Sequence, residues 1–550
     1  MKEVKHKPPF ELPRANIIDR TINYFNPEKG VRRMKSRVVM ALGGAYYGGS
    51  KRRRALSEWI VSAGDADSDI SFDLPTLRER SRDLVRNNPL ACGAIKTKTT
   101  SIVGTGLTLK STIDRDILEL DEEVADAWEN KTEAEWRLWA DKTDCDVEDT
   151  LNFSQIQELC VRSVLENGDT FILTPMKTDK RRTYSLQLQM IEADRVCNKN
   201  SQSDSVTLSG GIERSEFGGA PVKYHILKGH PGNIWSKNNE WQIVDGRGSK
   251  TGRKNVLHLF HKIRIGQSRG VPDLAPVIES LKQLGTYSKG ELDAAVVSSF
   301  FTVFVKSELG GADSLFNHNL GPMQPTSETG AKTSDKDYKM ASAAILDLAP
   351  GEDVEFANPS RPNQAFDQFI LAMSRQIGVA LELPFEILVK HFTASYSAAR
   401  AALLEAWKFY MSRRKWLADV LCKPVYELWM TEAVATGRIS APGFLSGDPL
   451  IRDAYLGSEW IGPAKGSIDE VKEVGAAEKR VNMGISTLDE ETKSLTGGNW
   501  EKKHRQRVKE VEKRKEGGLE SGGQKPPGGD QNQNNNDSET PDQSSEEQKG

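Results

Sequence analysis

The sequence predicts an α+β protein in which long helices alternate with small groups of strands. In several segments apolar residues recur every three or four positions, as they do on one face of a helix. Residues 185–190 (SLQLQM) instead alternate strictly between polar and apolar, which is typical of a strand. Two further helical patterns enclose strand-like patches between residues 300 and 356. With 550 residues, the chain is long enough for about three or four domains and a large core.

Residues 1–70 combine basic clusters with a glycine-rich run and predict an extended, basic N-terminal arm. The run GAYYGGSK (residues 44–51) is similar to a phosphate-binding loop. Such a loop needs Gly-Lys followed by Ser or Thr, whereas here Lys51 follows Ser50, and no apolar strand leads into the run. Nucleotide binding is therefore not expected there.

Residues 71–265 predict a mixture of helices and strands. A helix begins near Leu74 and ends before Pro89, where a second helix begins, because proline is favoured in the first turn of a helix. The segment 103–107 then turns into a strand. A charged helix follows, and its tryptophans at positions 128, 136 and 139 should dock it on a core; another apolar stripe predicts a helix over 153–165. The further predicted strands are 171–173, 185–190, 222–227, 241–244 and 256–260.

A small strand-containing module lies between two helices in the next part of the chain. The first helix is predicted over 272–297. The strand-like patches 301–305, 344–348 and 354–356 surround a polar loop at 309–336. The second helix carries an apolar stripe from Phe366 to Ala380 and is stopped by Pro384.

After an irregular segment at 385–396, a long helix is predicted from Ser397 to Cys422, with Thr393 and Ser395 as candidate caps. Pro424 either kinks this helix or begins a second one. Its apolar surface is large enough to need a large core or neighbouring subunits to cover it. Residues 437–500 predict shorter elements and 501–515 a charged helix. The stretch 516–550 has one leucine and no aromatic residue, so we expect disorder there.

The composition excludes several classes of protein. Lys and Arg number 75 against 78 Asp and Glu, and this net charge of −3 does not fit a tight, sequence-independent nucleic-acid binder. It does fit a surface past which DNA slides. The five cysteines are scattered with no CxxC pair, which indicates reduced thiols and no disulfide framework. Neither a secretion signal nor a membrane span is expected, because no uncharged apolar stretch is long enough.

The strongest enzymatic pattern is Gly266-Gln267-Ser268-Arg269-Gly270, a formal G-x-S-x-G between a predicted strand and helix, as in a serine hydrolase whose nucleophile would be Ser268. The preceding strand is too charged for the buried central strand of such enzymes. The downstream histidines, at positions 318, 391 and 504, offer no convincing triad partner. We therefore prefer a structural turn, and keep the hydrolase as the alternative.

No metal site is expected. There is no H-E-x-x-H, and the pairs His225/His230 and His258/His261 have no cysteine or carboxylate at a useful spacing in the sequence. Alternation in strands explains these histidines adequately.

Several runs together carry a family resemblance, and they follow one another in order from about residue 75 to 490. They are RNNPLACGAIKTKTTSIVGTGLTLKS (86–111), ENGDTFIL (166–173), IEADRV (191–196), GQSRGVPDLAPVIESLKQL (266–284), VALELPFEIL (379–388), HFTASYSAARAALLEAWKFY (391–410) and WIGPAKGSIDEVKE (460–473). The sequence resembles the portal proteins of tailed bacteriophages, of the lambda type.

The resemblance implies a portal-type fold with an α/β wing, long stem helices flanking a small β-containing clip, and a helical crown. Onto this sequence it maps the following parts: basic N-terminal arm, 1–70; wing, 71–265; stem helix, 266–299; clip, 300–358; second stem helix, 359–384; tunnel loop, 385–396; crown helices and C-terminal wing or crown region, 397–500; charged, disordered tail, 501–550.

The resemblance also implies a function. It predicts a non-enzymatic ring of about twelve subunits at one capsid vertex, closed by head-to-tail interfaces. Double-stranded DNA would pass through it non-specifically, and terminase, head-completion proteins and the major capsid or scaffold protein would dock on it. We expect assembly in the host bacterial cytoplasm, a final location in the virion, and no membrane contact and no cofactor.

The resemblance places the tunnel-loop residues Lys390, His391, Thr393 and Ser395 at the narrowest part of the channel. The basic run Arg413, Arg414 and Lys415 on the next helix faces DNA, the capsid interior or water, and the sequence does not choose among these.

Overall fold

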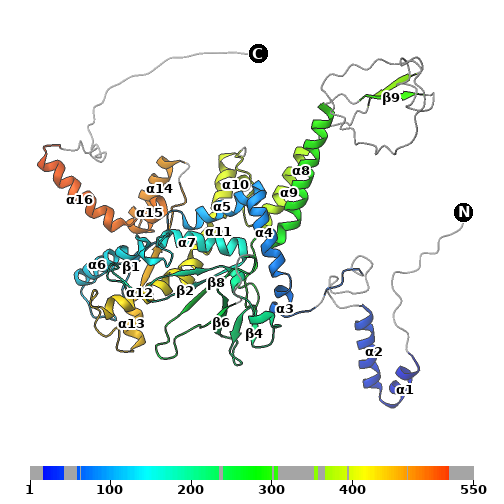
Figure 1. The fold of residues 1–550 in the computed structure, drawn as a ribbon, viewed down its shortest axis with the longest axis horizontal. Coiled ribbons are helices and arrows are strands. Elements are labelled where there is room, and N and C mark those ends of the chain that lie inside the picture. The colour runs from blue at the N-terminus through cyan, green and yellow to red at the C-terminus, as the bar shows by residue number, and fades with distance from the viewer. Residues whose placement is uncertain are drawn as a thin grey trace, which may run out of the picture. The chain divides into compact units, whose positions relative to one another are not determined.

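The computed structural model describes residues 16–42, 58–61, 63–233, 240–299, 303–307, 352–356, 366–392, 395–466 and 469–519. Figure 1 labels its helices and strands. The chain divides into two compact units: residues 1–72 with 264–266, and residues 73–263 with 267–550. Among the described residues, no helix has both the length and the apolar character that a membrane span requires.

The described part of the first unit contains three helices: α1 (Ile17–Phe25), α2 (Pro27–Leu42) and α3 (Ala66–Ser71). The prediction of an extended arm is therefore wrong over residues 17–42. Asn16 and Asp19 form a reciprocal capping box that starts α1. The buried Asp19 also pairs with Arg33 of α2 at 3.0 Å, which joins the two helices.

The second unit opens with the two predicted helices, α4 (Leu74–Asn87) and α5 (Pro89–Val103). The boundary between them follows from local chemistry. The Asn88 side chain accepts hydrogen bonds from the backbone N–H groups of Leu90 and Ala91, and Pro89 occupies the first turn of α5, where its missing N–H costs nothing. Both helices are confirmed.

An aromatic cluster forms the centre of the main core. Helix α6 (Glu122–Ala140) contributes Trp136 and Trp139, whose ring centroids lie 5.0 Å apart, and α7 (Phe153–Asn167) contributes Phe153. Trp136 also meets the rings of Tyr426, Trp429 and Trp460 from the C-terminal half of the chain. The docking role predicted for the tryptophans is confirmed: Trp136 and Trp139 are buried in the core, and the half-buried Trp128 packs against it.

Two antiparallel sheets lie between residues 169 and 260. The first has the order β3-β2-β8, with β2 (Asp169–Leu173) between β3 (Gln189–Ile191) and β8 (Val256–Phe260). The second has the order β4-β5-β6-β7 and comprises β4 (Leu208–Ser209), β5 (Ile212–Arg214), β6 (Pro221–Leu227) and β7 (Trp241–Asp245). The strand expected over 185–190 is mostly absent: Leu186 and Leu188 are buried as predicted, but they join isolated bridges instead of a ladder.

A two-stranded ribbon joins distant parts of the sequence. Strand β1 (Thr108–Ser111) pairs antiparallel with β11 (Ser458–Ile461). Strand β1 begins just after the predicted turn at 103–107, and no local pattern in the sequence indicated its partner.

The long helix α8 (Ile278–Ser299) follows the 3₁₀ turn η6 (Ala275–Val277) and lies beside α9 (Phe366–Ala380) (Figure 1). The Tyr287 ring of α8 contacts the Phe366 and Phe369 rings of α9. Between these helices in sequence, β9 (Val303–Ser307) pairs antiparallel with β10 (Glu352–Phe356). The patch expected at 344–348 lies outside the described residues.

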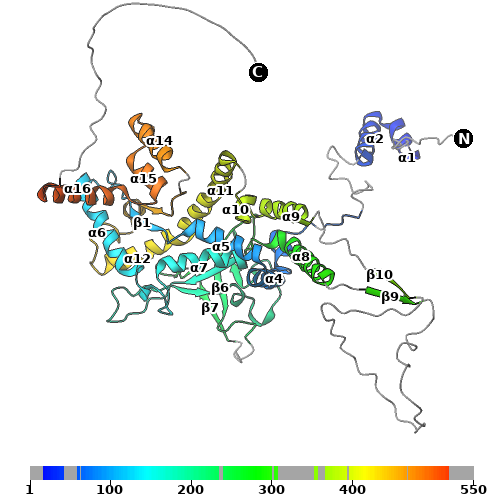
Figure 2. The ribbon, with the colours of Figure 1, turned by 90° about the horizontal axis from the view of Figure 1, so that it is seen from above.

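The C-terminal half is helical. Helix α10 (Phe385–Leu388) precedes α11 (Tyr396–Leu417), which continues through a π-helical turn, η7 (Ala418–Cys422), into α12 (Lys423–Ala435). Pro424 therefore lies in the first turn of a new helix, one of the two alternatives predicted. The remaining helices are α13 (Pro449–Tyr455), α14 (Glu470–Asn482), α15 (Leu488–Thr496) and α16 (Trp500–Glu516) (Figure 2). Helix α16 confirms the charged helix expected at 501–515, and residues 520–550 lie outside the described part.

Candidate functional site

The segment expected to line a channel is held at both ends. Before it, Leu381 and Leu383 are buried in the main core, and the Leu383 N–H donates to the Gly378 carbonyl at 2.9 Å. Helix α10 then buries Ile387 and Leu388 in the same core. The exposed stretch that follows is therefore anchored, and it ends where α11 begins.

Two of the predicted channel residues are exposed at the end of α10. Lys390 has a φ of +54° and an exposed side chain. His391 is exposed as well, and its backbone N–H donates to the Glu386 carbonyl at 3.1 Å. The backbone of this segment is fixed by hydrogen bonds, whereas the two side chains are exposed and can reach a passing ligand.

The hydroxyl residues of the segment have different outcomes. Ser395 is the N-cap of α11, and its Oγ accepts from the Ala398 N–H at 3.4 Å, so its expected capping role is confirmed. Thr393 lies outside the described residues. The structure thus brings Lys390, His391 and Ser395 into one short segment, and their contact with DNA stays a prediction.

The basic run on α11 splits into three environments. Arg414 is buried, and its Nε and Nη2 donate to the carbonyl oxygens of Ile102 and Ser101, both at 3.1 Å. These carbonyls end α5, so the guanidinium group satisfies acceptors that a helix terminus leaves open. Burial lowers the pKa of Arg414 to about 10, which keeps it charged at neutral pH. The option that Arg414 faces DNA is therefore wrong.

The neighbours of Arg414 remain accessible to different degrees. Arg413 is half-buried, with its guanidinium group 5.0 Å from the centroid of the Phe409 ring and 3.9 Å from a Glu382 carboxylate oxygen. Lys415 is exposed and pairs with Asp419 of the following π turn at 3.4 Å. Only Lys415 keeps the exposed position that a DNA-facing or water-facing role needs.

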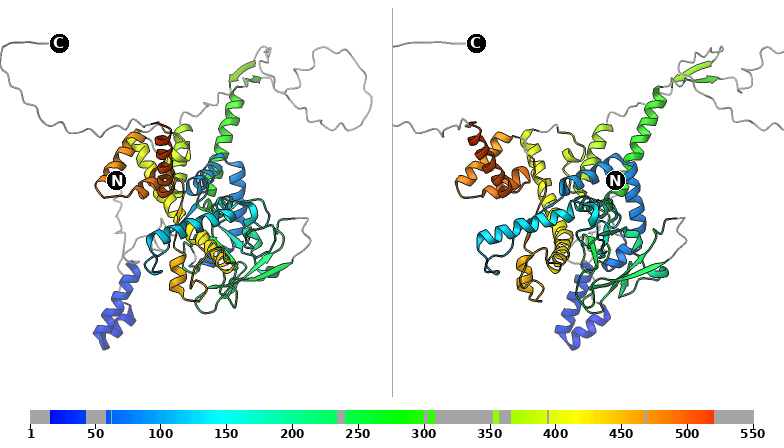
Figure 3. Two further views of the ribbon diagram at one scale, coloured as in Figure 1. Left: turned by 90° about the vertical axis from the view of Figure 1, so that its left-hand side faces the viewer. Right: turned by 60° about the vertical axis from the view of Figure 1, so that its left-hand side comes forward.

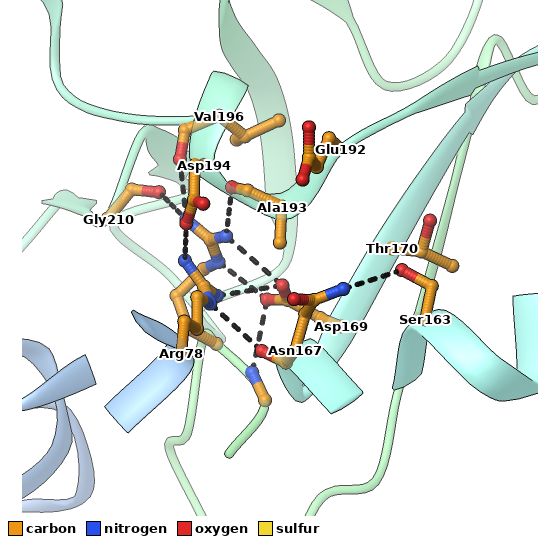
Figure 4. Close-up of polar contacts among 12 residues, drawn as sticks. Arg78, Ser163, Asn167, Asp169, Thr170, Glu192, Ala193, Asp194, Val196 and Gly210 are labelled. Carbon is orange, nitrogen blue, oxygen red and sulfur yellow. Dashed lines mark hydrogen bonds and ion pairs between the residues drawn. The ribbon is translucent and has the colours of Figure 1, made fainter. Parts of the chain in front are cut away.

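A buried charge cluster surrounds Asp169 at the start of β2 (Figure 4). Arg78 Nη2 lies 2.8 Å from Asp169 Oδ1, and Arg269 Nε lies 2.6 Å from Oδ2. His258 Nε2 and the Gly270 N–H approach Oδ2 at 3.3 and 3.1 Å. Although burial raises the pKa of a carboxyl group, the two guanidinium groups outweigh it and hold the pKa of Asp169 well below its usual range.

The two arginines of this cluster join separate elements. Arg269 donates to the carbonyl oxygens of Val196 and Gly210, each at 2.6 Å, and to that of Ala193 at 2.8 Å. Arg78, from α4, donates to the Asn167 carbonyl at 2.9 Å. The cluster therefore ties α4, β2 and the loops of the second sheet to the segment that leads into α8. Sequence reasoning missed it, although an acidic residue two positions before the apolar run Phe171-Ile172-Leu173 was a signal.

The same cluster explains the G-x-S-x-G pattern. Strand β8 ends at Phe260 and η6 begins at Ala275, so the motif lies in a long connection and not in the tight strand-turn-helix of a nucleophile elbow. A Cβ on Gly270 would lie 2.0 Å from the Gly168 carbonyl oxygen. The second glycine of the motif is thus needed because its backbone approaches that of Gly168 closely. The Arg269 side chain pairs with the buried Asp169. This arrangement supports the structural turn and gives the hydrolase alternative no support.

The histidines have carboxylate neighbours that the sequence spacing did not reveal. His225 Nε2 lies 2.7 Å from a Glu213 oxygen. His230 lies 3.6 and 3.4 Å from Glu192 and Asp194, and these three form a group with the spacing of metal ligands. Arg82, however, pairs with both carboxylates of that group. Because the arginine already neutralises them, the group is better described as an ion-pair network.

Comparison with known proteins gives consistent matches. Residues 52–414 match the model of a family described as phage portal protein, lambda family. Portal protein B of Escherichia phage lambda is 27% identical over 489 residues, which cover 87% of this chain and 90% of that protein. The portal protein of Escherichia phage N15 is 27% identical over 490 residues, with 87% and 90% covered. Among solved structures, a chain of the "Neck of native GTA particle computed with C12 symmetry" is 14% identical with a TM-score of 0.38, covering 77% of this chain and 93% of that one. A TM-score below 0.5 does not establish a shared fold.

Proposed function

Because the chain belongs to the lambda family of phage portal proteins, we propose that it forms a ring at one capsid vertex through which double-stranded DNA is packaged and ejected. The observation that carries this proposal is the family match over residues 52–414, which includes the wing, α8, α9 and most of α11. In this reading α8 and α9 are the stem, β9 and β10 belong to the clip, and α11 and the helices after it build the crown.

Exposed apolar side chains on the two stem helices support ring assembly. Leu292 and Val296 of α8 are 65% and 48% exposed, and Phe369 and Val379 of α9 are 46% and 81% exposed. Burying them between subunits would remove apolar area from water. A ring of about twelve copies needs a different surface on each side of every subunit, and two adjacent helices provide two such surfaces.

Lys390 and His391 are proposed to face the channel, with Thr393 and Ser395 beside them. An ammonium group on an exposed, anchored segment contacts phosphates without reading bases, so its contacts exchange as the duplex moves. Repetition around the ring gives many weak contacts in place of one tight site. A net charge of −3 for the chain keeps such contacts weak.

The ring is further proposed to be the docking platform for terminase, for head-completion proteins and for the major capsid or scaffold protein. In this reading the chain resides in the virion, after assembly in the host cytoplasm, and has no catalytic role. The energy of packaging comes from ATP hydrolysis by terminase. A fluorophosphonate probe tests the last point, because a Ser268-dependent adduct would contradict it.

The test of the channel combines electron microscopy with a packaging assay. We expect rings with a central hole wide enough for duplex DNA. The double variant Lys390→Ala with His391→Ala should form the same rings but package DNA several-fold more slowly. Lys408→Ala is the matched control, since it removes an exposed charge from α11 that already pairs with Glu405. Normal packaging by the double variant would exclude this segment as the channel contact, and monomers at all concentrations would contradict the ring.

A further inference from the structure

The C-terminal helices α14, α15 and α16 leave apolar side chains exposed in a groove with a cationic rim. Figure 3 shows these helices, coloured orange to red, from two sides. The groove between α15 and α16 is lined by apolar Leu488, Val508 and Val511, which are 52%, 43% and 41% exposed. Arg507 and Lys515 of α16 line the same groove. Apolar residues exposed together in this way indicate a surface that a partner covers.

Helical periodicity places the groove residues on one face of α16. Arg507, Val511 and Lys515 follow one another at intervals of about one turn, so they share a face; Arg514, also about one turn from Val511, and Val508 lie at its edges. Among the residues that the structure describes, none of these three cations pairs with a carboxylate. Lys509 and Lys513 lie on the opposite face of the helix. The groove therefore offers positive charge around an apolar floor.

A surface of matching character lies elsewhere on the same chain. The turn before α6 and its first turns expose seven carboxylates and a single arginine, Arg115; the carboxylates are Asp114, Asp116, Glu119, Asp121, Glu122, Glu123 and Asp126. Two apolar residues, Ile117 and Val124, are 40% and 51% exposed among them. We name residues 114–126 the acidic knob.

The knob is held in shape before any partner arrives. The Ile117 and Leu118 N–H groups donate to the side chain and the carbonyl of Asp114, at 3.2 and 3.1 Å, and the Leu120 N–H donates to the Arg115 carbonyl at 3.0 Å. Leu118 and Leu120 pack against the main core. A rigid, preorganised surface loses little entropy when it binds.

Helices α6 and α16 of one subunit already pair with each other. Lys502 of α16 lies 2.5 Å from a Glu133 oxygen of α6, and Arg505 donates to Asn130 at 2.7 Å. These contacts involve neither the groove cations Arg507 and Lys515 nor the knob, residues 114–126.

We propose that the groove between α15 and α16 receives the acidic knob of a second copy of this chain. Ile117 and Val124 would cover Leu488, Val508 and Val511, while the knob carboxylates face Arg507 and Lys515. Groove and knob are different surfaces, so the contact is head-to-tail and suits a closed ring. The inference rests on the proposed function and adds to it one contact between neighbouring subunits. We call this contact, between residues 114–126 of one subunit and the groove of the next, the clasp.

Duplex DNA is the competing occupant of a cationic helix, and the apolar residues of the groove disfavour it. The exposed valines have no role against a phosphate backbone, whereas they fit the apolar residues of the knob.

Charge reversal with a matched control tests the clasp. The groove variant is Arg507→Glu with Lys515→Glu, and the knob variant is Asp116→Lys with Glu123→Lys. The control, Lys509→Glu with Lys513→Glu, makes the same charge change on the opposite face of α16. Association of the full-length chain is measured by analytical ultracentrifugation at low and high salt, with circular dichroism to confirm folding.

We expect each reversed variant to raise the dissociation constant at least about tenfold, most strongly at low salt, while the control stays close to wild type. Mixing the groove variant with the knob variant should restore association, because each then meets an oppositely charged partner. Rings that survive the groove reversal, or a mixture that fails to associate, would overturn the clasp but leave the ring standing. Wild-type chains that never associate would overturn both proposals. Groove variants that assemble normally but lose retention on duplex DNA would identify DNA as the occupant and overturn the clasp.

Discussion

Replacing Asp169 by asparagine tests whether the buried charge cluster holds α4 and β2 to the segment that enters α8. The substitution keeps the shape of the side chain but removes its charge. Asp169 is fully buried and accepts hydrogen bonds from Arg78, Arg269 and the Gly270 N–H. After the change, two buried guanidinium groups would share one neutral carbonyl oxygen, and an amide N–H₂ would point at a positive charge.

The size of the effect follows from the cost of leaving a buried charge without its partner. Breaking a buried ion pair from one side typically costs about 3–5 kcal/mol. Arg269 keeps its three carbonyl acceptors and Arg78 keeps Asn167 and Asp194, which moderates the loss. We therefore expect the free energy of unfolding to fall by about 3 kcal/mol, a large part of the roughly 5–15 kcal/mol available to a folded domain.

Urea denaturation followed by tryptophan fluorescence measures this loss, because Trp136 and Trp139 lie in the main core. Asp179→Asn is the matched control: the half-buried Asp179 pairs with the exposed Arg181, and loss of this surface pair should leave the midpoint nearly unchanged. A decrease below about 1 kcal/mol for Asp169→Asn would refute the reasoning, since it would mean that the cluster contributes no more than a surface pair.

The same cluster makes a prediction about pH. The folded pKa of Asp169 lies below the value of about 3.9 for an unfolded aspartate, so its contribution to stability is complete above that value and is lost as pH falls below it. The difference between wild type and Asp169→Asn should therefore be largest near neutral pH and shrink progressively in acid. A difference that stays constant down to pH 2 would contradict the assignment.

Three further predictions concern the frame around the candidate channel segment. Arg414→Met should lower the free energy of unfolding by about 2–4 kcal/mol, because two carbonyls at the end of α5 lose a charged donor. Lys415→Met should change this free energy by less than about 0.5 kcal/mol, and equal effects of the two substitutions in urea melts would refute the assignment. Gly270→Ala should destabilise by about 1–3 kcal/mol through the clash with Gly168, while Gly290→Ala in α8, where a Cβ meets nothing within 4 Å, should be neutral or stabilising by up to about 1 kcal/mol in the same assay. Burial, together with the charges of Arg413 and Lys98, lowers the pKa of His261 to about 3. Between pH 6.5 and 3 the unfolded state therefore binds a proton that the folded state does not, and the free energy of unfolding should decrease as the pH is lowered. His261→Gln should flatten this pH dependence, and an unchanged slope would contradict the prediction.

The parts of the fold that sequence reasoning predicted are those with a local cause. Pro89 and the capping residue before it define the boundary between α4 and α5, and apolar spacing outlines α7, α8 and α9. Strand β11 escaped prediction because its pairing with β1 joins residues about 350 positions apart, and no period in either segment indicates the other. Helix α1 was not predicted, because the basic clusters and the glycine-rich run of residues 1–70 indicated an extended arm, although Asn16 and Asp19 form a capping box.

The candidate site shows the same division. The exposure of Lys390 and His391 follows from a polar stretch between two helices, and the capping by Ser395 follows from its place before an alanine-rich turn. The sequence could not separate Arg414 from Lys415, since three adjacent cations look alike. Their difference arises from Gly462, where any Cβ would lie 2.5 Å from Arg414 Nε. A glycine on a distant segment leaves the room in which one arginine of the run is buried.

The allocation of charges therefore separates two kinds of cation in this chain. Arg78, Arg269 and Arg414 are buried, and each is already bound to carboxylate or carbonyl oxygens, so none of them is available to a phosphate without unfolding its surroundings. Lys390 belongs to the other kind, exposed on a segment whose two ends are held by the core and by a helix cap. Under the proposed function this arrangement suits a channel that must not retain DNA, because exposed charges on an anchored segment exchange partners quickly while the frame behind them stays rigid. Substitutions of the first kind should change stability, and substitutions of the second kind should change packaging rate with stability intact.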